Sequence, residues 1–324
     1  MRKKKFSIPY DASDIDNFLK ELDKRKEYVH DVFVALPGVD NYFTPETQSI
    51  SKNYDLVCHN FLLRTRGMFP RFVPLNADYS DLYLDDMKET FLPVVIRLLK
   101  QYEIDGVICS NFYMAKQIKE EIPSIRIDTS CNCGHWSIAV MKGWQKEVDV
   151  EAFNVPREAG RNYPFLKQVH DQGIPIKLLL NERCSPFCPY LAGFCMSHHR
   201  WDPGCYMDDR EDCRHTICNT IVFPRWLDKL DSIVDVYKIT GRYMPPDYIF
   251  RVLDLYIKGE NCKLSDLIMF QKPGEFDIDT SAFDDRMLYC GFKGCGVTCN
   301  YCAEADKKLP VNNDPNWYHH THTA

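Results

Sequence analysis

The amino-acid sequence predicts an α/β fold, a TIM-type (β/α) barrel with a cysteine-rich C-terminal extension. Short apolar runs that resemble buried strands alternate with helical patterns of about ten to fifteen residues, which indicates parallel strands joined by right-handed crossovers. Seven or eight such steps within about 240 residues favour a closed barrel over an open sheet. We therefore expect an N-terminal helix in residues 1–30, the barrel in 31–260 and the extension in 261–324.

The spacing of apolar residues predicts the individual elements. Asp14 or Ser13 caps a first helix that runs to about Tyr28. Further helices are expected at 82–102, 112–121, 136–145, 157–171 and 246–258. Runs of β-branched or aromatic residues predict strands at 31–36, 54–59, 71–78, 106–111, 126–130, 148–154 and 174–182. Residues 221–230 and 234–242 are expected to continue the same alternation of strands and helices.

Composition and charge restrict the class of protein. The net charge of −6 argues against a general nucleic-acid-binding surface, although a local basic groove for RNA stays compatible with it. No segment approaches the roughly 20 apolar residues of a membrane helix. The basic start, residues 1–14, lacks the apolar stretch of a secretory signal, so we interpret it as a solvated terminus. We expect a cytoplasmic protein without a membrane partner.

The 15 cysteines are the most informative residues, and six of them lie directly after the apolar run that ends at Leu180. Without an export signal, clustered cysteines indicate metal ligation rather than disulfides. Iron-sulfur clusters need about four converging thiolates, with some ligands close in sequence and the others further along. The ligands that best meet this need are Cys184, Cys188, Cys213 and Cys218, with Cys195 and Cys205 as alternatives.

Zinc is the competing metal at this central site, because His198, His199 or His215 can join the same thiols in a tetrahedral set. Spacing alone leaves both metals open. A second group near the C-terminus is as compact as a ferredoxin ligand run and predicts a closed iron-sulfur or zinc site. Part of it also has the spacing of radical S-adenosylmethionine enzymes. Its four members are Cys290, Cys295, Cys299 and Cys302.

Polar residues at the carboxyl ends of the expected strands are candidates for the active site, because catalysis in such barrels takes place there. Lys238 and Arg242 flank a glycine turn and can clamp an anionic group; the alternative is salt bridges to nearby carboxylates. Asp128, Ser130 and Asn132 alternate along one face of a strand and its exit. If that face is the barrel interior they bind substrate or belong to a network of polar side chains; otherwise they cap the next helix.

Two further candidates concern acid-base and nucleophilic chemistry. Glu182, beside Cys184, is a candidate general acid, with helix capping or loop structure as the alternative. Cys131, Cys133 and His135 can suggest a thiol nucleophile, but such residues at a strand exit more often pack or assist a metal.

Three stretches resemble the collagenase-like peptidase family, peptidase family U32, and the likeness extends over about residues 30–302. The most specific is VYKITGRYMPPDYIFRVLDLYIKG, and the others are RIDTSCN and LLLNERCSPFCP. The resemblance implies a barrel with a [4Fe-4S] cluster held by four cysteines. It carries functional residues over to Asn132, Cys184, Lys238 and Arg242.

Despite the family name, the resemblance implies an oxygen-independent hydroxylase, because several members of that family have this activity. They act on RNA bases or on quinone precursors, and some use prephenate as oxygen donor. An anionic co-substrate of this kind suits Lys238 and Arg242. The chain departs from the family at Asn181 and Glu182, where many members have a histidine-glycine pair, and at 152–154, where an arginine-glutamate pair is common. The substrate class, whether RNA, a small aromatic or a peptide, is therefore left open.

Three functions follow from these observations. The first is an iron-sulfur-dependent, oxygen-independent hydroxylase or a related modification enzyme. The second is a peptidase, as the family name suggests. The third is a non-catalytic iron-sulfur partner or scaffold protein, which would form a stable complex with another chain.

Overall fold

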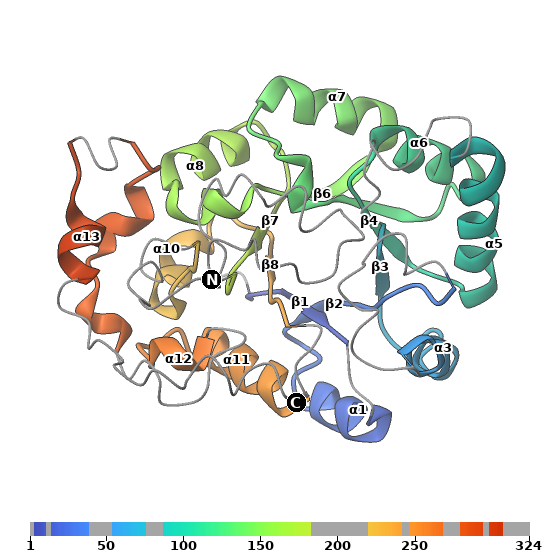
Figure 1. Cartoon of the computed structure of the whole chain (residues 1–324), viewed down its shortest axis with the longest axis horizontal. Helices are drawn as coiled ribbons and strands as arrows, with labels where there is room; N and C mark the ends of the chain where they lie inside the picture. Colours follow the sequence, from blue (N-terminus) through green and yellow to red (C-terminus); the bar gives the residue numbers. More distant parts are fainter. Residues whose placement is uncertain are drawn as a thin grey trace, which may run out of the picture.

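The computed structural model describes residues 3–10, 14–38, 54–75, 87–182, 220–241, 246–267, 279–293 and 298–306. Eight parallel strands form a closed barrel in sequence order, and β8 pairs with β1 to close it (Figure 1). The predicted TIM-type barrel is confirmed. The strands are β1 (Phe6–Pro9), β2 (Val29–Phe33), β3 (Arg71–Leu75), β4 (Gly106–Cys109), β5 (Arg126–Thr129), β6 (Val150–Asn154), β7 (Ile176–Leu179) and β8 (Val236–Lys238).

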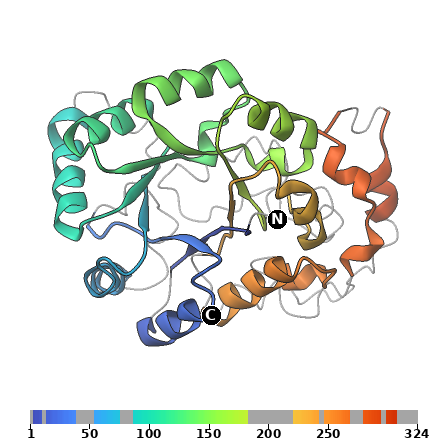
Figure 2. The same ribbon diagram turned by 180° about the vertical axis from the view of Figure 1, so that it is seen from behind.

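Helices surround the barrel on the outside (Figure 2). Side-chain caps fix several of their starts: Asp14 accepts a hydrogen bond from the amide of Asn17, and Asn111 accepts one from the amide of Met114. The longer helices are α1 (Ile15–Asp23), α3 (Tyr54–Arg64), α5 (Leu92–Tyr102), α6 (Phe112–Glu121), α7 (Ile138–Val148), α8 (Tyr163–Asp171) and α11 (Pro246–Lys258).

Shorter helical segments connect and extend these elements. They are η2 (Met87–Phe91), η3 (Cys131–Cys133), η4 (Arg157–Arg161), η6 (Pro224–Trp226), α10 (Leu227–Leu230), α12 (Leu264–Leu267), η7 (Thr280–Ala282), η8 (Asp285–Tyr289) and α13 (Tyr301–Asp306). The segment from η7 to α13 lies beside α8 in both views (Figures 1 and 2). It is held there by Asp285, which accepts hydrogen bonds from Trp226 Nε1 at 2.8 Å and Arg225 Nε at 3.0 Å.

Two predicted elements are wrong. The segment 54–59 forms the start of helix α3 rather than a strand. The N-terminal stretch is not a solvated terminus throughout, because Phe6–Pro9 is fully buried and supplies the first barrel strand. The barrel therefore begins at Phe6, which is 25 residues before the expected start at residue 31.

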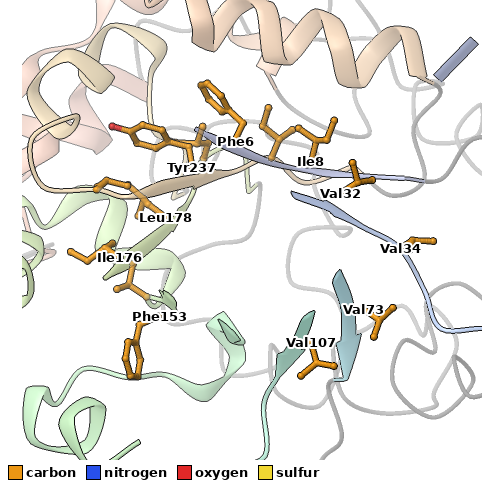
Figure 3. Packing of buried hydrophobic residues seen from close by; sticks show 14 of the residues in the cluster. Phe6, Ile8, Val32, Val34, Val73, Val107, Phe153, Ile176, Leu178 and Tyr237 are labelled. Atoms are coloured by element: carbon orange, nitrogen blue, oxygen red, sulfur yellow. The ribbon is translucent and has the colours of Figure 1, made fainter. Parts of the chain in front are cut away.

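The apolar core has two parts. The larger part lies between the strands and the helices, and Figure 3 shows its side chains on successive strands, among them Phe6, Val73 and Phe153. The smaller part lies inside the barrel and consists of Phe33, Phe72 and Ile108. Gly106 leaves room for the Phe72 ring, since a Cβ there would meet that ring at 2.4 Å. Charged side chains share the barrel interior with this small cluster, among them Asp31, Asp128 and Lys177.

Two irregularities in strand pairing determine which of these charged residues face inward. Between β1 and β2 the register passes from Phe6–Val29 to Ser7–Asp31, so that His30 is an extra residue. Between β5 and β6 it passes from Ile127–Val150 to Asp128–Ala152, so that Glu151 is extra. Such β-bulges re-aim side chains and are common at the rims of barrels. Here the two extra residues contact each other, with His30 Nε2 3.6 Å from Glu151 Oε1.

Candidate functional site

The carboxyl end of β8 places Lys238 where the sequence predicted a functional cation. Its ammonium group lies over the Phe33 ring, 4.6 Å from the centroid. A cation at this distance from an aromatic face is attracted by the ring quadrupole. Arg242, the other half of the predicted anion clamp, lies outside the described residues.

Asn181, which follows β7, organises the turn that leaves β8. Its side-chain Oδ1 accepts hydrogen bonds from the Thr240 amide at 2.7 Å and the Thr240 hydroxyl at 3.0 Å. Its Nδ2 donates to the Leu267 carbonyl at 3.3 Å. The Asn181 side chain is fully buried, so these bonds replace water for both partners. Asn181 thus has a structural role, the joining of two strand ends.

Glu182 and Asn132 both contact Arg157, the first residue of η4. Arg157 Nη2 donates to Asn132 Oδ1 at 3.0 Å, and Arg157 Nη1 lies 3.4 Å from Glu182 Oε2. The arginine thereby connects the ends of β5 and β7. This arrangement agrees with the structural alternative for Glu182, and the predicted role as general acid stays a prediction.

Asp128 and Ser130 have different surroundings although they lie on one strand. Ser130 accepts a hydrogen bond from the Asn132 amide at 3.3 Å and caps η3, the alternative role considered for it. Asp128 points into the barrel, where its Oδ2 accepts a hydrogen bond from Lys177 at 2.6 Å. Its other oxygen, Oδ1, has no hydrogen-bond partner within the described part of the chain. Of this predicted set, Asp128 is the interior residue.

Lys177 was missed by the sequence interpretation and occupies the centre of the barrel. Besides Asp128, its ammonium group donates to Asp31 Oδ2 at 2.8 Å. All three side chains are completely buried. Ser7 supports Asp31 by donating to its Oδ1 at 2.5 Å, and the Phe72 ring lies 5.0 Å from the ammonium group. A buried cation between two carboxylates is stable only with such close geometry.

A second layer of charges lies at the amino-terminal end of the barrel. His30 Nδ1 is 2.7 Å from Asp31 Oδ2, and Arg126 forms a two-pronged ion pair with Glu151. Paired guanidinium and carboxylate groups of this geometry are among the strong hydrogen-bonded pairs. The side chains of His30 and Glu151 are 21% and 32% exposed, so this layer reaches solvent.

In each layer some pKa values rise and others fall; at Asp31, burial is outweighed by Lys177 and His30, which lower the pKa. Burial raises the pKa of Asp128. At Lys177 burial lowers the pKa, but the carboxylates of Asp128 and Asp31 raise it by more. Burial also opposes the shift at His30, but hydrogen bonds to Asp31 and Glu151 raise its pKa. At Glu151, burial is outweighed by hydrogen bonds from Arg126 and His30, which lower the pKa to about 2.

The Glu151 shift predicts a specific pH dependence. Because the folded-state pKa is depressed from 4.5 to about 2, Glu151 contributes stability above pH 4.5 that is lost as the pH falls toward 2. Arg126→Met removes the guanidinium donors that bond Glu151, so the folded-state pKa of Glu151 rises toward its ordinary value. The stability difference between wild type and this variant is therefore expected to shrink between about pH 5 and pH 2.5, as measured by urea unfolding.

The control for this measurement is Lys116→Met, which removes an exposed partner of Glu147. Its difference from wild type should change little over the same pH range. A difference for Arg126→Met that stays constant with pH would contradict the assigned Glu151 pairing.

Burial disfavours a thiolate at Cys109 and Cys133, which pack at the ends of β4 and β5. Burial raises the pKa of Cys133, and burial lowers the pKa of His135 to about 4. Cys109, packed nearby, has its pKa raised by burial to about 12. A nucleophilic cysteine needs a stabilised thiolate. These values agree with the packing alternative for Cys131, Cys133 and His135.

Three of the four C-terminal candidate ligands are described. Burial raises the pKa of Cys290. The thiols of Cys302 and Cys299 interact electrostatically with Cys290 and raise its pKa further. The Gly291 amide donates to the Arg161 carbonyl at 2.8 Å, which docks this segment on η4. Within the described ranges, no group of three or more histidine, cysteine or acidic side chains has an arrangement that could hold a metal ion.

The remaining predicted ligands lie outside the described residues. They are Cys184, Cys188, Cys213 and Cys218, together with Cys195, Cys205 and Cys295. Their ligand roles stay predictions. No helix in the described parts of the chain is long and apolar enough to span a bilayer.

Comparisons with known proteins agree with the barrel. No protein-family model matches the chain. An uncharacterized protease from Methanocaldococcus jannaschii is 23% identical over 334 aligned positions, which cover 94% of this chain and 96% of that protein. A U32 peptidase of known structure superposes with a TM-score of 0.52 at 12% identity, covering 74% of this chain and 94% of that chain. The second likeness shows a common fold.

Proposed function

Because the near full-length relative and the shared barrel support assignment of this chain to peptidase family U32, we propose that it is an iron-sulfur-dependent, oxygen-independent hydroxylase or a related modification enzyme. The observation that carries the proposal is the cysteine-rich stretch that directly follows β7, at the end of the barrel where catalysis takes place in this fold. Soft thiolate donors in such number suit an iron-sulfur cluster.

Four cysteines would hold the cluster: Cys184 and Cys188 with two of Cys195, Cys205, Cys213 and Cys218. When bound, a [4Fe-4S] cluster supplies one-electron redox chemistry. The described residues on either side of this stretch in the sequence fix two strand ends. Asn181 fixes the exit of β7 against the turn after β8, and Arg157 ties Glu182 to Asn132. Such fixed supports keep a reactive group in one geometry.

Lys238 supplies positive charge at the same end of the barrel and would bind an anionic co-substrate together with Arg242. The cation at the end of β8 sits on the Phe33 ring, which limits its positions. The substrate itself, whether RNA base, small aromatic or peptide, is a matter for experiment. The C-terminal thiols would hold a second iron-sulfur or zinc site.

The proposal is tested by purifying the protein without oxygen and measuring iron, acid-labile sulfide and the EPR spectrum of the reduced protein. We expect about four iron atoms per chain from the central site. Cys184→Ala should remove this iron. Cys302→Ala should leave the central cluster in place and remove only the metal of the second site. Deoxyadenosine formation from S-adenosylmethionine would instead indicate the radical mechanism.

Cys58→Ala is the matched control, because Cys58 is a buried thiol on α3 and belongs to neither cysteine group. Its iron content should equal that of wild type. Zinc without iron in the wild-type protein, or unchanged iron in Cys184→Ala, would refute the proposal.

A peptidase is the second candidate, because the near full-length relative is named as a protease. It predicts peptide cleavage that persists in Cys184→Ala after the iron is lost. Cleavage that disappears together with the cluster would count against it.

A further inference from the structure

A continuous series of titratable side chains runs through the barrel from its amino-terminal end. Glu151 Oε1 lies 3.6 Å from His30 Nε2, and His30 Nδ1 lies 2.7 Å from Asp31 Oδ2. Lys177 Nζ then contacts Asp31 Oδ2 at 2.8 Å and Asp128 Oδ2 at 2.6 Å. Each step from His30 to Asp128 is within hydrogen-bond distance.

The two ends of this series differ in their access to water. Glu151 and His30 are partly exposed, whereas Asp31, Lys177 and Asp128 are completely buried. The two extra residues of the β-bulges, His30 and Glu151, form the exposed end. Asp128 forms the buried end, two residues before Ser130 on the strand that leads to the candidate site. Its Oδ1 has no hydrogen-bond partner in the described ranges.

The charges inside the barrel balance in two ways. The cations His30, Lys177 and Arg126 face the three carboxylates of Asp31, Asp128 and Glu151. If His30 gives up its proton and Asp128 gains one, the sum of these charges is still zero. The other polar neighbours contribute equally to both arrangements: Ser7 is a neutral donor to Asp31, and Lys238, on the Phe33 ring, adds the same positive charge to each.

We propose that His30, Asp31, Lys177 and Asp128 form a proton relay that connects solvent at the amino-terminal end of the barrel to Asp128. In one passage, His30 Nδ1 gives its proton to Asp31 Oδ2, Lys177 gives one to Asp128 Oδ2, and Asp31 returns one to Lys177. His30 has then lost one proton and Asp128 has gained one, while Asp31 and Lys177 are unchanged. Solvent reprotonates the imidazole.

The relay extends the proposed function, on which its catalytic purpose rests. It lets a proton reach the layer beneath the carboxyl-end site without opening that end to water. His30 and Glu151 would then be positioned by the bulges for proton uptake, and Lys177 would be a positioning residue as well as a carrier.

The relay is tested by the exchange of the Lys177 ammonium protons with solvent, measured by NMR on full-length protein labelled with ¹⁵N at the lysine side chains. The backbone amide of Leu178, in the same strand, reports ordinary opening of the barrel. Because a relay exchanges protons without opening, the Lys177 protons should exchange at least about tenfold faster than this amide. His30→Gln should slow the Lys177 exchange to the rate of the amide, whereas Asp128→Asn should leave it fast.

His59→Gln is the matched control, since that histidine lies on α3 and bonds the Tyr102 hydroxyl at 2.7 Å. It should not alter the exchange of Lys177. If His30→Gln does not fold, Glu151→Gln tests the same uptake end and should also slow the exchange. Lys177 exchange at the rate of the Leu178 amide in wild type, or exchange unaffected by both uptake-end variants, would overturn the relay and leave a static ion-pair network.

No iron and no substrate are needed for this measurement. Failure of the relay therefore leaves the iron-sulfur proposal intact, and absence of iron leaves the relay intact.

Discussion

Replacing Lys177 by methionine is expected to lower the free energy of unfolding by about 3–5 kcal/mol, the usual cost of removing one partner from a buried ion pair. The substitution would leave the carboxylates of Asp31 and Asp128 in the barrel interior without their shared cation. Methionine has a similar length and keeps most of the packing against Phe72. Urea denaturation at pH 7, followed by circular dichroism, measures the loss.

Two comparisons make this prediction specific. Lys167→Met removes an exposed lysine that pairs with Asp171 and should leave the unfolding midpoint nearly unchanged. Adding Asp128→Asn to Lys177→Met removes one unpaired carboxylate and should recover part of the lost stability. A loss below about 1 kcal/mol for Lys177→Met, the value of a surface pair, would mean that the barrel interior is hydrated.

Asn181→Ala should cost about 1–3 kcal/mol of unfolding free energy, because it removes the hydrogen bonds of a buried side chain and leaves the Thr240 amide without its acceptor. The Thr240 hydroxyl keeps the backbone carbonyl of residue 181 at 3.4 Å, and the Leu267 carbonyl keeps the Tyr248 hydroxyl at 3.1 Å. Urea denaturation gives the magnitude. Hydrogen exchange at the Thr240 amide gives the location, since this amide should lose its protection while the amides of β7 keep theirs.

Asn17→Ala provides the control, since Asn17 lies on α1 and its side chain makes an exposed contact of 3.5 Å with Asp247. Its effect should be small. If Asn181→Ala is as mild as this control, Asn181 does not hold the two strand ends together, and the fixed geometry attributed to the site would be lost with it.

Much of the fold could be predicted because its strands are apolar on their outer faces and its helices carry caps. The alternation from Gly106 to Leu180 reads directly as strands and helices, and the barrel follows from their number. The failures have local causes. The segment 54–59 has only three apolar residues, at positions 56–58, between an aspartate and a histidine, a run too short for periodicity to distinguish a strand from a helix. Phe6–Pro9 is only four residues long and follows a basic cluster, so the sequence pattern did not indicate a buried strand there.

The candidate site was only partly predictable, because contacts between strands depend on register. Asp128 was identified from its alternation with Ser130, but its partner Lys177 was not. A signal for Lys177 was present in the sequence, since a lysine between Ile176 and Leu178 interrupts an otherwise apolar strand. In a barrel whose outer face is apolar, such a residue must face the interior. His30 could not be found this way, because its inward position depends on a bulge.

The bulges at His30 and Glu151 also mean that either residue could be removed without changing the pairing partners of the residues beside it. Deleting His30 would join Val29 directly to Asp31, and their partners Phe6 and Ser7 are already consecutive. The same holds for Glu151, whose flanking residues pair with Ile127 and Asp128. Each bulge therefore adds one side chain to the barrel while every other strand position keeps its facing.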